Sequence, residues 1–574
     1  MGNGMAAENT LYYGDNLDIL RHHMPSASVD LIYLDPPFNS NADYNVIFRE
    51  QTGERSAAQI KAFTDTWHWV TQGEERPTER AYENLLERAS DNVAKMLEAM
   101  VRFIGRNDLT AYLVMMTERL VELHRVLKPT GSLYLHCDPT ASHYLKIVLD
   151  TMFGPTNFRS EIIWKRTTAH NDPKRPGRIH DTILLYTKSD AYVWNKVYTP
   201  YSQEYVESHY RNMDAQGRRY RLDNLTAPAH GSSAGQYEWQ GRIPPPGRMW
   251  SLTQDKMDAL FAESRIRLTR TGMPEYIRYL DEMPGVPLQD VWDNIPAINS
   301  QADERIGYPT QKPLTLLERI ISASSNPSDV VLDPFCGCGT AVCAAEKLGR
   351  LWIGIDITHL AVSLMKSRLK DMFGLDAHKH YKVIGEPTDL KGARQLALDD
   401  RYQFQYWAVS LVEATAQDQE QQKKKGADKG IDGIIAFIDG HQRRRETIIA
   451  QVKSGHVTSS HIRDLKGVLE REKAALGLYI CLEPPTRDML EEAGNAGFYK
   501  SELWPGAHGD HRWPRIQIRT IEDLLAGNSF TLPPRPVQYK QAARVQQPAA
   551  ATTGNLWSQG APTGTDDEGL FDDE

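Results

Sequence analysis

Residues 330–356 carry the pattern that most restricts how this chain can fold. The apolar runs Val330–Asp333 and Leu351–Asp356 are typical of short buried strands, and Ala341–Leu348 has the apolar spacing of a helix. Between the first strand and the helix lies Pro334–Thr340, a loop with two glycines. This order predicts a βαβ unit with two parallel strands, and therefore an α/β fold in which helices cover the sheet.

The loop of this unit predicts a binding site for a cofactor that contains adenosine. Gly337 and Gly339 let the backbone turn tightly against a bound molecule. Asp356 ends the following strand, where its carboxylate can accept hydrogen bonds from both hydroxyls of a ribose. A nicotinamide dinucleotide fits less well, because Val342 occupies the place of the third glycine in G-x-G-x-x-G. A tight loop without a ligand is the alternative.

A second motif, Asp35-Pro36-Pro37-Phe38, directly follows the apolar run Val29–Leu34. The prolines predict a stiff turn that leaves a carboxylate at the end of a strand. An exocyclic amino nitrogen of a base is a poor nucleophile, and acceptors for its two N–H groups would aim its lone pair at a methyl donor. Asp35 and the Pro36 carbonyl can accept these bonds, and Phe38 can stack on an unstacked base. A strand-ending turn with a buried Phe38 is the competing interpretation.

Three changes in composition divide the chain. Apolar periodicity lapses in residues 376–403, which predicts a domain boundary. Residues 198–299 are rich in proline, glycine and aromatic side chains and predict an irregular insert between two α/β segments. Residues 533–574 replace periodic apolar positions with Pro, Gln, Ala, Thr and Gly and end in acidic residues, which predicts a disordered acidic tail.

Three motifs together resemble the hallmarks of S-adenosylmethionine-dependent DNA amino-methyltransferases: Asp35–Phe38, Asp333–Thr340 and the intervening Tyr308–Pro313. The tetrapeptide comes first and the cofactor loop last, which is similar to the permuted β group of modification subunits in restriction systems. The resemblance covers residues 8–375 and implies a Rossmann-like methyltransferase sheet. Residues 190–305 would then form an inserted target-recognition region. Five of its arginines would either contact DNA or form a solvated basic surface: Arg242, Arg248, Arg265, Arg267 and Arg270.

The resemblance also implies roles for single residues. Asp35, Pro36, Pro37 and Phe38 would form the catalytic turn, with Asp35 bonded to the target amino group and Phe38 stacked on the flipped base. Lys312 is expected near the carboxylate of the cofactor. The D-P-P-F form favours adenine over cytosine, because cytosine enzymes of the family more often begin with serine. S-adenosylmethionine would be bound by residues from the loop, the next strand and the third motif: Asp333, Phe335, Gly337, Gly339, Thr340, Asp356, Gln311, Lys312 and Pro313.

Residues 398–530 predict a second, smaller α/β domain that resembles restriction endonucleases. Asp432 starts one apolar strand, and Gln451 and Lys453 end another, so the three side chains can meet across paired strands. This arrangement resembles the D…QxK form of the PD-(D/E)XK core in Mrr-like enzymes. Asp432 and Gln451 would then bind Mg²⁺, and Lys453 would be the catalytic lysine. Because Gln451 is neutral, an upstream acid such as Glu413 would have to help; an inactive fold that only binds DNA is the alternative.

Composition limits the classes of function that are open to the chain. Lys and Arg number 66 and Asp and Glu number 75, so the formal net charge is −9 and a DNA-binding surface must be a local patch. Five cysteines in 574 residues are too few for a disulfide framework, and no apolar run is long enough to cross a membrane, so a cytoplasmic protein is expected. Zinc is not expected at Cys336, Cys338 and Cys343, because no fourth ligand follows at finger-like spacing.

These patterns predict an enzyme that methylates an amino group in DNA and carries a metal-dependent nuclease. Its expected partners are double-stranded DNA and, because many β-group relatives pair, a second copy of the chain. Two alternatives remain: methylation of RNA or of a protein glutamine, and a DNA-binding scaffold in which both centres are inactive.

Overall fold

The structure is a computed structural model, and it forms two compact units. One unit comprises residues 1–194 and 290–574, and the other comprises residues 195–289. No helix within the described ranges is both long and apolar enough to span a lipid bilayer. The described residues are 8–37, 69, 77–139, 141–168, 174, 176–229, 235–298, 304, 311–412, 414–416, 430–440, 444–504 and 512–534.

The larger unit contains a nine-stranded sheet within its described part. Strand β5 runs antiparallel to both of its neighbours, and every other pair of adjacent strands is parallel. The structure therefore confirms the expected α/β class. In spatial order the strands are β14 (Val291–Trp292), β4 (Phe158–Lys165), β5 (His180–Thr187), β3 (Leu127–Cys137), β2 (Val29–Leu34), β15 (Val330–Asp333), β16 (Leu351–Asp356), β1 (Thr10–Tyr13) and β17 (Lys382–Ile384).

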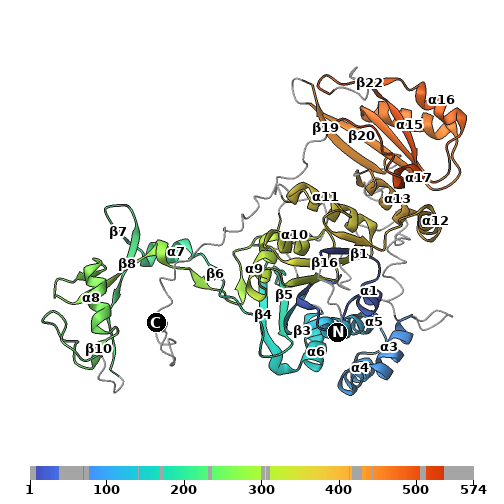
Figure 1. Ribbon diagram of the computed structural model, residues 1–574. Helices are drawn as coiled ribbons and strands as arrows, with labels where there is room; N and C mark the ends of the chain where they lie inside the picture. The colour runs from blue at the N-terminus through green and yellow to red at the C-terminus, as the bar shows by residue number, and fades with distance from the viewer. Residues whose placement is uncertain are drawn as a thin grey trace, which may run out of the picture. The chain divides into compact units, whose positions relative to one another are not determined.

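Helices cover both faces of this sheet, as Figure 1 shows. The central strand β2 is buried at every position, and its Ile32 and Leu34 pack in one core with apolar side chains of α1, α5 and α6. On one side lie α9 (Leu314–Ser324), α10 (Thr340–Lys347) and α11 (His359–Phe373). On the other side lie α1 (Asn16–His23), α5 (Asp108–Val126) and α6 (Ser142–Phe153), with α3 (Pro77–Arg88) and α4 (Asp91–Ile104) packed on them.

The segment in which apolar periodicity lapses is not devoid of structure. Strand β17 pairs in parallel with β1, so the first sheet extends to Ile384. Helices α12 (Leu390–Asp399) and α13 (Arg401–Ser410) follow it directly. The strand has only three residues, which is too short for an alternating pattern to mark it in the sequence.

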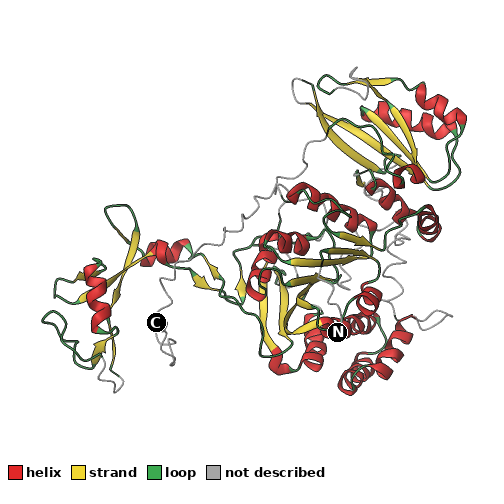
Figure 2. Cartoon of the chain, in the orientation of Figure 1, coloured by secondary structure: helices red, strands yellow, loops and turns green. Residues whose placement is uncertain are grey.

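Residues after this point form a second sheet of five described strands. Helices α15 (Ser459–Glu472) and α16 (Arg487–Gly494) pack on one face, and α13 and α17 (Ile521–Leu525) on the other (Figure 2). Its strands, in spatial order, are β18 (Thr415–Ala416), β19 (Gly433–Asp439), β20 (Arg444–Lys453), β21 (Leu476–Cys481) and β24 (Ile516–Thr520); β22 (Phe498–Lys500) and β23 (Arg512–Pro514) form a separate ribbon.

The smaller unit, residues 195–289, overlaps most of the segment 198–299 that the sequence marks as an insert. Its core is small and rests on the buried rings of Trp239 and Trp250. Its helices are α7 (Gln203–His209) and α8 (Gln254–Ala262), and its strands are β6 (Tyr198–Thr199), β7 (Asn212–Met213), β8 (Arg219–Asn224), β9 (Thr226–Pro228), β10 (Arg248–Trp250), β11 (Ile266–Leu268), β12 (Pro274–Tyr279) and β13 (Val286–Pro287).

Candidate functional site

Two motifs that are far apart in the sequence meet at one edge of the nine-stranded sheet. Strand β15 lies between β2 and β16, and all three strands run parallel. Their carboxyl ends therefore lie at the same edge, where Asp35 follows β2, Asp333 ends β15 and Asp356 ends β16. This edge is where open α/β sheets bind ligands.

The glycine loop is held in a tight turn. Gly337 and Gly339 both have positive φ values, +50° and +75°, which side chains rarely allow. The Gly339 N–H donates to the Cys336 carbonyl at 2.7 Å, and the Phe335 N–H donates to Asp333 Oδ1 at 3.1 Å. Burial raises the pKa of the Asp333 carboxyl well above its usual range. Asp333 thus stabilises the turn of the glycine loop by accepting a hydrogen bond from its backbone.

Asp356 connects this loop to the next helix. Its Oδ2 accepts from Gly337 N at 2.9 Å, and its Oδ1 accepts from the backbone N–H and the hydroxyl of Thr358 at 2.9 and 2.8 Å. Burial raises the pKa of Asp356 to about 6, and these hydrogen bonds oppose the rise. A carboxylate has about four lone-pair sites, so these three bonds leave at most one for a hydroxyl of a ribose.

Asp35 is paired with a lysine from the third motif. Lys312 Nζ donates to Asp35 Oδ2, and both side chains are largely buried. The neighbouring Gln311 is tied back by a 2.6 Å bond from its Nε2 to the Glu304 carbonyl, and Pro313 caps α9. Phe38 and Tyr308–Thr310 lie outside the described residues.

Three polar residues outside the predicted cofactor-binding set support the loop. Asn16 Nδ2 donates to the Pro334 carbonyl at 2.7 Å, and Arg119 Nε donates to Asn16 Oδ1 at 2.7 Å. From the opposite helix layer, the buried Arg368 donates to Thr340 Oγ1 at 3.1 Å and to the Cys338 carbonyl at 3.2 Å. Asn16 is the first residue of α1, which begins three residues after β1 ends.

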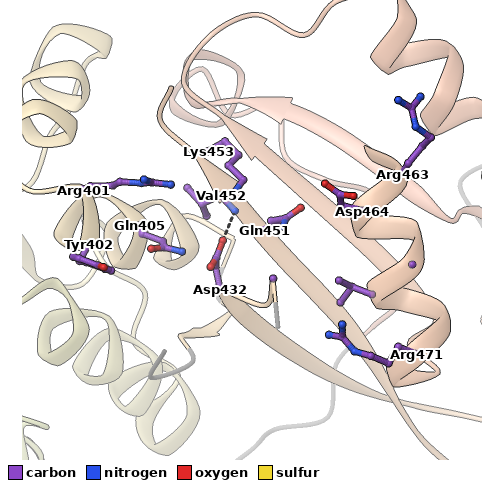
Figure 3. Close-up of a pocket in the computed structure, with 13 residues that line it drawn as sticks. Arg401, Tyr402, Gln405, Asp432, Gln451, Val452, Lys453, Arg463, Asp464 and Arg471 are labelled. Atoms are coloured by element: carbon purple, nitrogen blue, oxygen red, sulfur yellow. Dashed lines mark hydrogen bonds between the residues drawn. The ribbon is translucent and has the colours of Figure 1, made fainter. Parts of the chain in front are cut away.

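A second cluster of polar residues lines a pocket of the five-stranded sheet (Figure 3). Strands β19 and β20 are antiparallel, with Gly433 opposite Ala450, so Asp432 lies at the level of Gln451. Asp432 is buried, and its Oδ2 accepts from the Val452 N–H at 2.7 Å. Asp432, Gln451 and Lys453 all line the pocket.

The donors of this pocket suit a hard divalent cation. The Gln451 side chain is 6% exposed, and among the described residues its Oε1 has no hydrogen-bond partner. A buried amide oxygen without a partner is costly, and a cation would satisfy it. Glu413, the expected further acid, lies outside the described residues. The remaining polar walls come from α13 and α15: Arg401, Tyr402, Gln405, Arg463, Asp464 and Arg471.

Comparison with known proteins identifies both parts of the chain. Residues 29–367 match the family model described as DNA methylase. The chain belongs to the DNA methylase family. Residues 399–508 match the family model described as restriction endonuclease, the Mrr type. Both resemblances that the sequence indicates are confirmed, and the protein joins a methylase domain to an endonuclease domain.

The curated relatives of the methylase domain vary in length. The type II methyltransferase M.EcaI of Enterobacter cloacae is 30% identical over 364 residues, which are 63% of this chain and 69% of the relative. The Mod subunit of the type III restriction-modification enzyme StyLTI from Salmonella typhimurium is 26% identical over 60% of this chain, which spans only 50% of that subunit. The solved PvuII DNA methyltransferase (cytosine-N4-specific) is 13% identical, with a TM-score of 0.32 over 63% of this chain and 89% of its own; so low a score does not bear on the target base.

Three buried polar side chains form a hydrogen-bonded series next to the sheet edge at which Asp35 lies. The Tyr33 hydroxyl lies 2.9 Å from His136 Nδ1, and His136 Nε2 lies 3.3 Å from Asp181 Oδ2. All three side chains are buried, and Tyr33 lies on β2, two residues before Asp35, which follows the strand. This hydrogen-bonded series therefore holds the end of β2, which Asp35 directly follows.

The five arginines of the insert differ in their surroundings. Arg248 donates to Thr226, and Arg265 forms an ion pair with Glu282, so both stabilise the fold of the smaller unit. Arg267 and Arg270 are exposed, which is what contacts to DNA phosphates require. The predicted use of these arginines in DNA binding stays a prediction.

We expect Gly339→Ala to destabilise the methylase domain more than Gly349→Ala. Both glycines flank α10 with nearly equal φ values, +75° and +71°, so the backbone penalty of a Cβ, about 1–2 kcal/mol, is shared. A Cβ on Gly339 would lie 2.2 Å from Met365 Cγ, whereas one on Gly349 would meet nothing within 4 Å. The clash should cost about 1–3 kcal/mol more, seen as a lower midpoint of thermal unfolding. Equal midpoints for the two variants would contradict this packing.

Proposed function

We propose that the methylase domain transfers a methyl group from S-adenosylmethionine to the N6 amino group of adenine in double-stranded DNA. The observation that carries this proposal is the common sheet edge of Asp35, the glycine loop and Asp356. An acceptor for an amino group and a loop suited to an adenosine cofactor stand there on neighbouring strands. The D-P-P-F form of the motif supports adenine as the target.

Each residue at this edge has a chemical task in the proposed reaction. When bound, S-adenosylmethionine supplies a methyl group on a positively charged sulfur. Asp356 would accept from a ribose hydroxyl, and the glycine loop would leave room for the cofactor backbone. Asp35 and the Pro36 carbonyl would accept the two N–H groups of the target nitrogen and aim its lone pair. Lys312 donates a hydrogen bond to Asp35 Oδ2 and would so hold the carboxylate in place beside the target nitrogen.

Transfer of a labelled methyl group to nucleic acid, followed by nucleoside analysis, tests this function. The full-length protein should label varied duplex DNA and yield N6-methyladenine. N4-methylcytosine would refute the choice of base but keep the enzyme class. Label in RNA or in a protein glutamine, with none in any duplex, would establish the alternative substrate class.

We expect the affinity for S-adenosylmethionine to fall at low pH through Asp356. Its pKa of about 6 lies above the usual value, so lowering the pH protonates it within a mild range and removes an acceptor for the ribose. If only the carboxylate form binds well, the dissociation constant should rise about tenfold from about pH 7.5 to about pH 5. Calorimetry measures this change. In Asp356→Asn the side chain cannot titrate, so a dissociation constant that still rises at low pH in this variant would assign the effect to another group.

We further propose that the endonuclease domain cleaves DNA with Mg²⁺. The Oε1 of Gln451 has no partner within the described part of the chain and lies in the pocket with Asp432, which supports a metal at this place. Asp432 and Gln451 would hold the ion, whose chemistry is to polarise the phosphodiester. Lys453 would orient the attacking water, and the arginines of α13 and α15 would contact the DNA backbone. Cleavage that is equal with and without a divalent cation would refute this proposal.

Several finer expectations stay predictions from the sequence. They concern target recognition by residues 190–305, the domain limits 8–375 and 398–530, pairing of two copies of the chain, and a cytoplasmic location. The predicted disordered tail lies outside the described residues, except for Pro533 and Pro534.

A further inference from the structure

Helix α13 of the endonuclease domain contacts the methylase domain close to the turn between β16 and α11, which follows Asp356. The helix packs against β18 and β20 of the five-stranded sheet and also against α11. Its apolar residues Phe404 and Trp407 belong to the core of the endonuclease domain. Gln403 and Ser410 are seven residues apart and share a face of the helix, and both contact α11.

The contact of Gln403 is a buried hydrogen bond at the first residue of α11. Gln403 Oε1 accepts from the His359 N–H at 2.8 Å, and the two residues are 7% and 0% exposed. The first N–H groups of a helix have no partner within it, so an acceptor from elsewhere is needed when they are buried. Gln403 supplies that acceptor across the two domains.

This bond continues a series that starts in the glycine loop. Gly337 N donates to Asp356, Asp356 accepts from Thr358, and the next residue, His359, donates to Gln403. The ring of His359 is also stacked on Tyr13, with centroids 3.6 Å apart and an angle of 18° between the rings. The turn that carries Asp356 is therefore held between a strand of the methylase sheet and a helix of the endonuclease domain.

We propose that Gln403 is a positioning residue of the S-adenosylmethionine site, supplied by the endonuclease domain. It does not touch the cofactor; it fixes the turn from which Asp356 would bind the ribose. Without an acceptor, the buried His359 N–H is left unsatisfied, and the turn must shift to find another partner. The proposal rests on the proposed cofactor site of the methylase domain.

The same helix lines the nuclease pocket with other side chains. Arg401, Tyr402 and Gln405 lie on the walls of the pocket that holds Asp432 (Figure 3). One helix thus contributes to both sites, from different faces. A methylase domain that ends before α13 lacks a residue that its cofactor site needs.

Calorimetry with S-adenosylmethionine and methylation kinetics on the full-length protein test this role. Gln403→Met keeps the size of the side chain but removes its oxygen. We expect its dissociation constant and its KM for S-adenosylmethionine to rise about tenfold, which corresponds to about 1.4 kcal/mol, while kcat at saturating cofactor stays unchanged. Gln403→Glu retains an acceptor at a helix N-terminus, where a carboxylate is favoured, and should restore the affinity to within about twofold.

The control is Gln395→Met, the same substitution at an exposed glutamine of α12 whose Nε2 donates to Asp399 Oδ1. It should bind the cofactor as the wild type does. Wild-type affinity in Gln403→Met would overturn the proposal, and so would equal losses in the Met and Glu variants, because these would indicate a packing effect. If the wild type itself fails to bind S-adenosylmethionine, the proposed function of the site fails first, and the role of Gln403 falls with it.

Discussion

Asp35→Ala should lower the rate of methyl transfer at saturating cofactor and DNA by about 100- to 1000-fold. Asp35 is the only carboxylate of the catalytic turn Asp35–Phe38, and its removal leaves the target nitrogen without the acceptor that aims its lone pair. The loss should fall on the chemical step, because Asp35 faces the target base in the proposed reaction and not the ribose of the cofactor. Single-turnover transfer of a labelled methyl group to duplex DNA measures it directly.

Two comparisons separate this effect from a general loss of structure. Asp35→Ala should still bind S-adenosylmethionine within about threefold of the wild type, because Asp356 and the glycine loop are intact. Asp190→Ala removes another ion-paired carboxylate, which bonds to Arg159 and is 92% exposed, and should retain full activity. If Asp35→Ala lowers the rate of methyl transfer by less than tenfold, Asp35 does not activate the target nitrogen.

Lys453→Ala should lower DNA cleavage by about 100-fold or more while methyl transfer stays at the level of the wild type. Lys453 ends β20 beside Asp432 in the pocket of the endonuclease domain, and no other lysine lines that pocket within the described residues. Without its ammonium group, the attacking water loses the cation that orients it. Timed cleavage of duplex DNA with Mg²⁺ measures the loss, and labelled methyl transfer on the same preparation shows that the protein is folded.

The matched control is Lys500→Ala, an exposed lysine of β22 that lies outside the pocket lining. It should cut at the wild-type rate. Asp432→Asn keeps an oxygen that can accept the bond from the Val452 N–H but removes the charge that a cation needs, so it should demand far more Mg²⁺ for the same rate. Equal cleavage by wild type, Lys453→Ala and Asp432→Asn would show that the domain binds DNA without cutting it.

The local elements of both sites could be predicted because each is encoded within a few neighbouring residues. Strand β2, with Asp35 directly after it, and strand β16, with Asp356 at its end, have the predicted bounds. An apolar run that ends in prolines or glycines marks a buried strand and its turn without any knowledge of the rest of the fold. The pairing of Asp432 with Gln451 was also predictable, because only one hairpin separates the two strands.

Contacts between distant segments could not be predicted in this way. Asn16 and Arg119 support the glycine loop from helices on the far side of the sheet, and Arg368 supports it from α11. A polar residue on a helix gives the same local signal whether it faces solvent or a loop that lies hundreds of positions away. The bond from His359 to Gln403 is of the same kind, since it joins two domains that the sequence shows only as separate patterns.

The sequence by itself determined the family, the α/β class and the residue types that both proposed reactions need, because motifs of adjacent residues carry that information. Only the tertiary structure decided that Asp35 stands beside the glycine loop, since this requires β15 to insert between β2 and β16. It also decided that Lys312 pairs with Asp35 and that α13 serves both domains. The physical reason is that the order of strands and the packing of helices minimise the free energy of the whole chain, and no spacing within one segment records it.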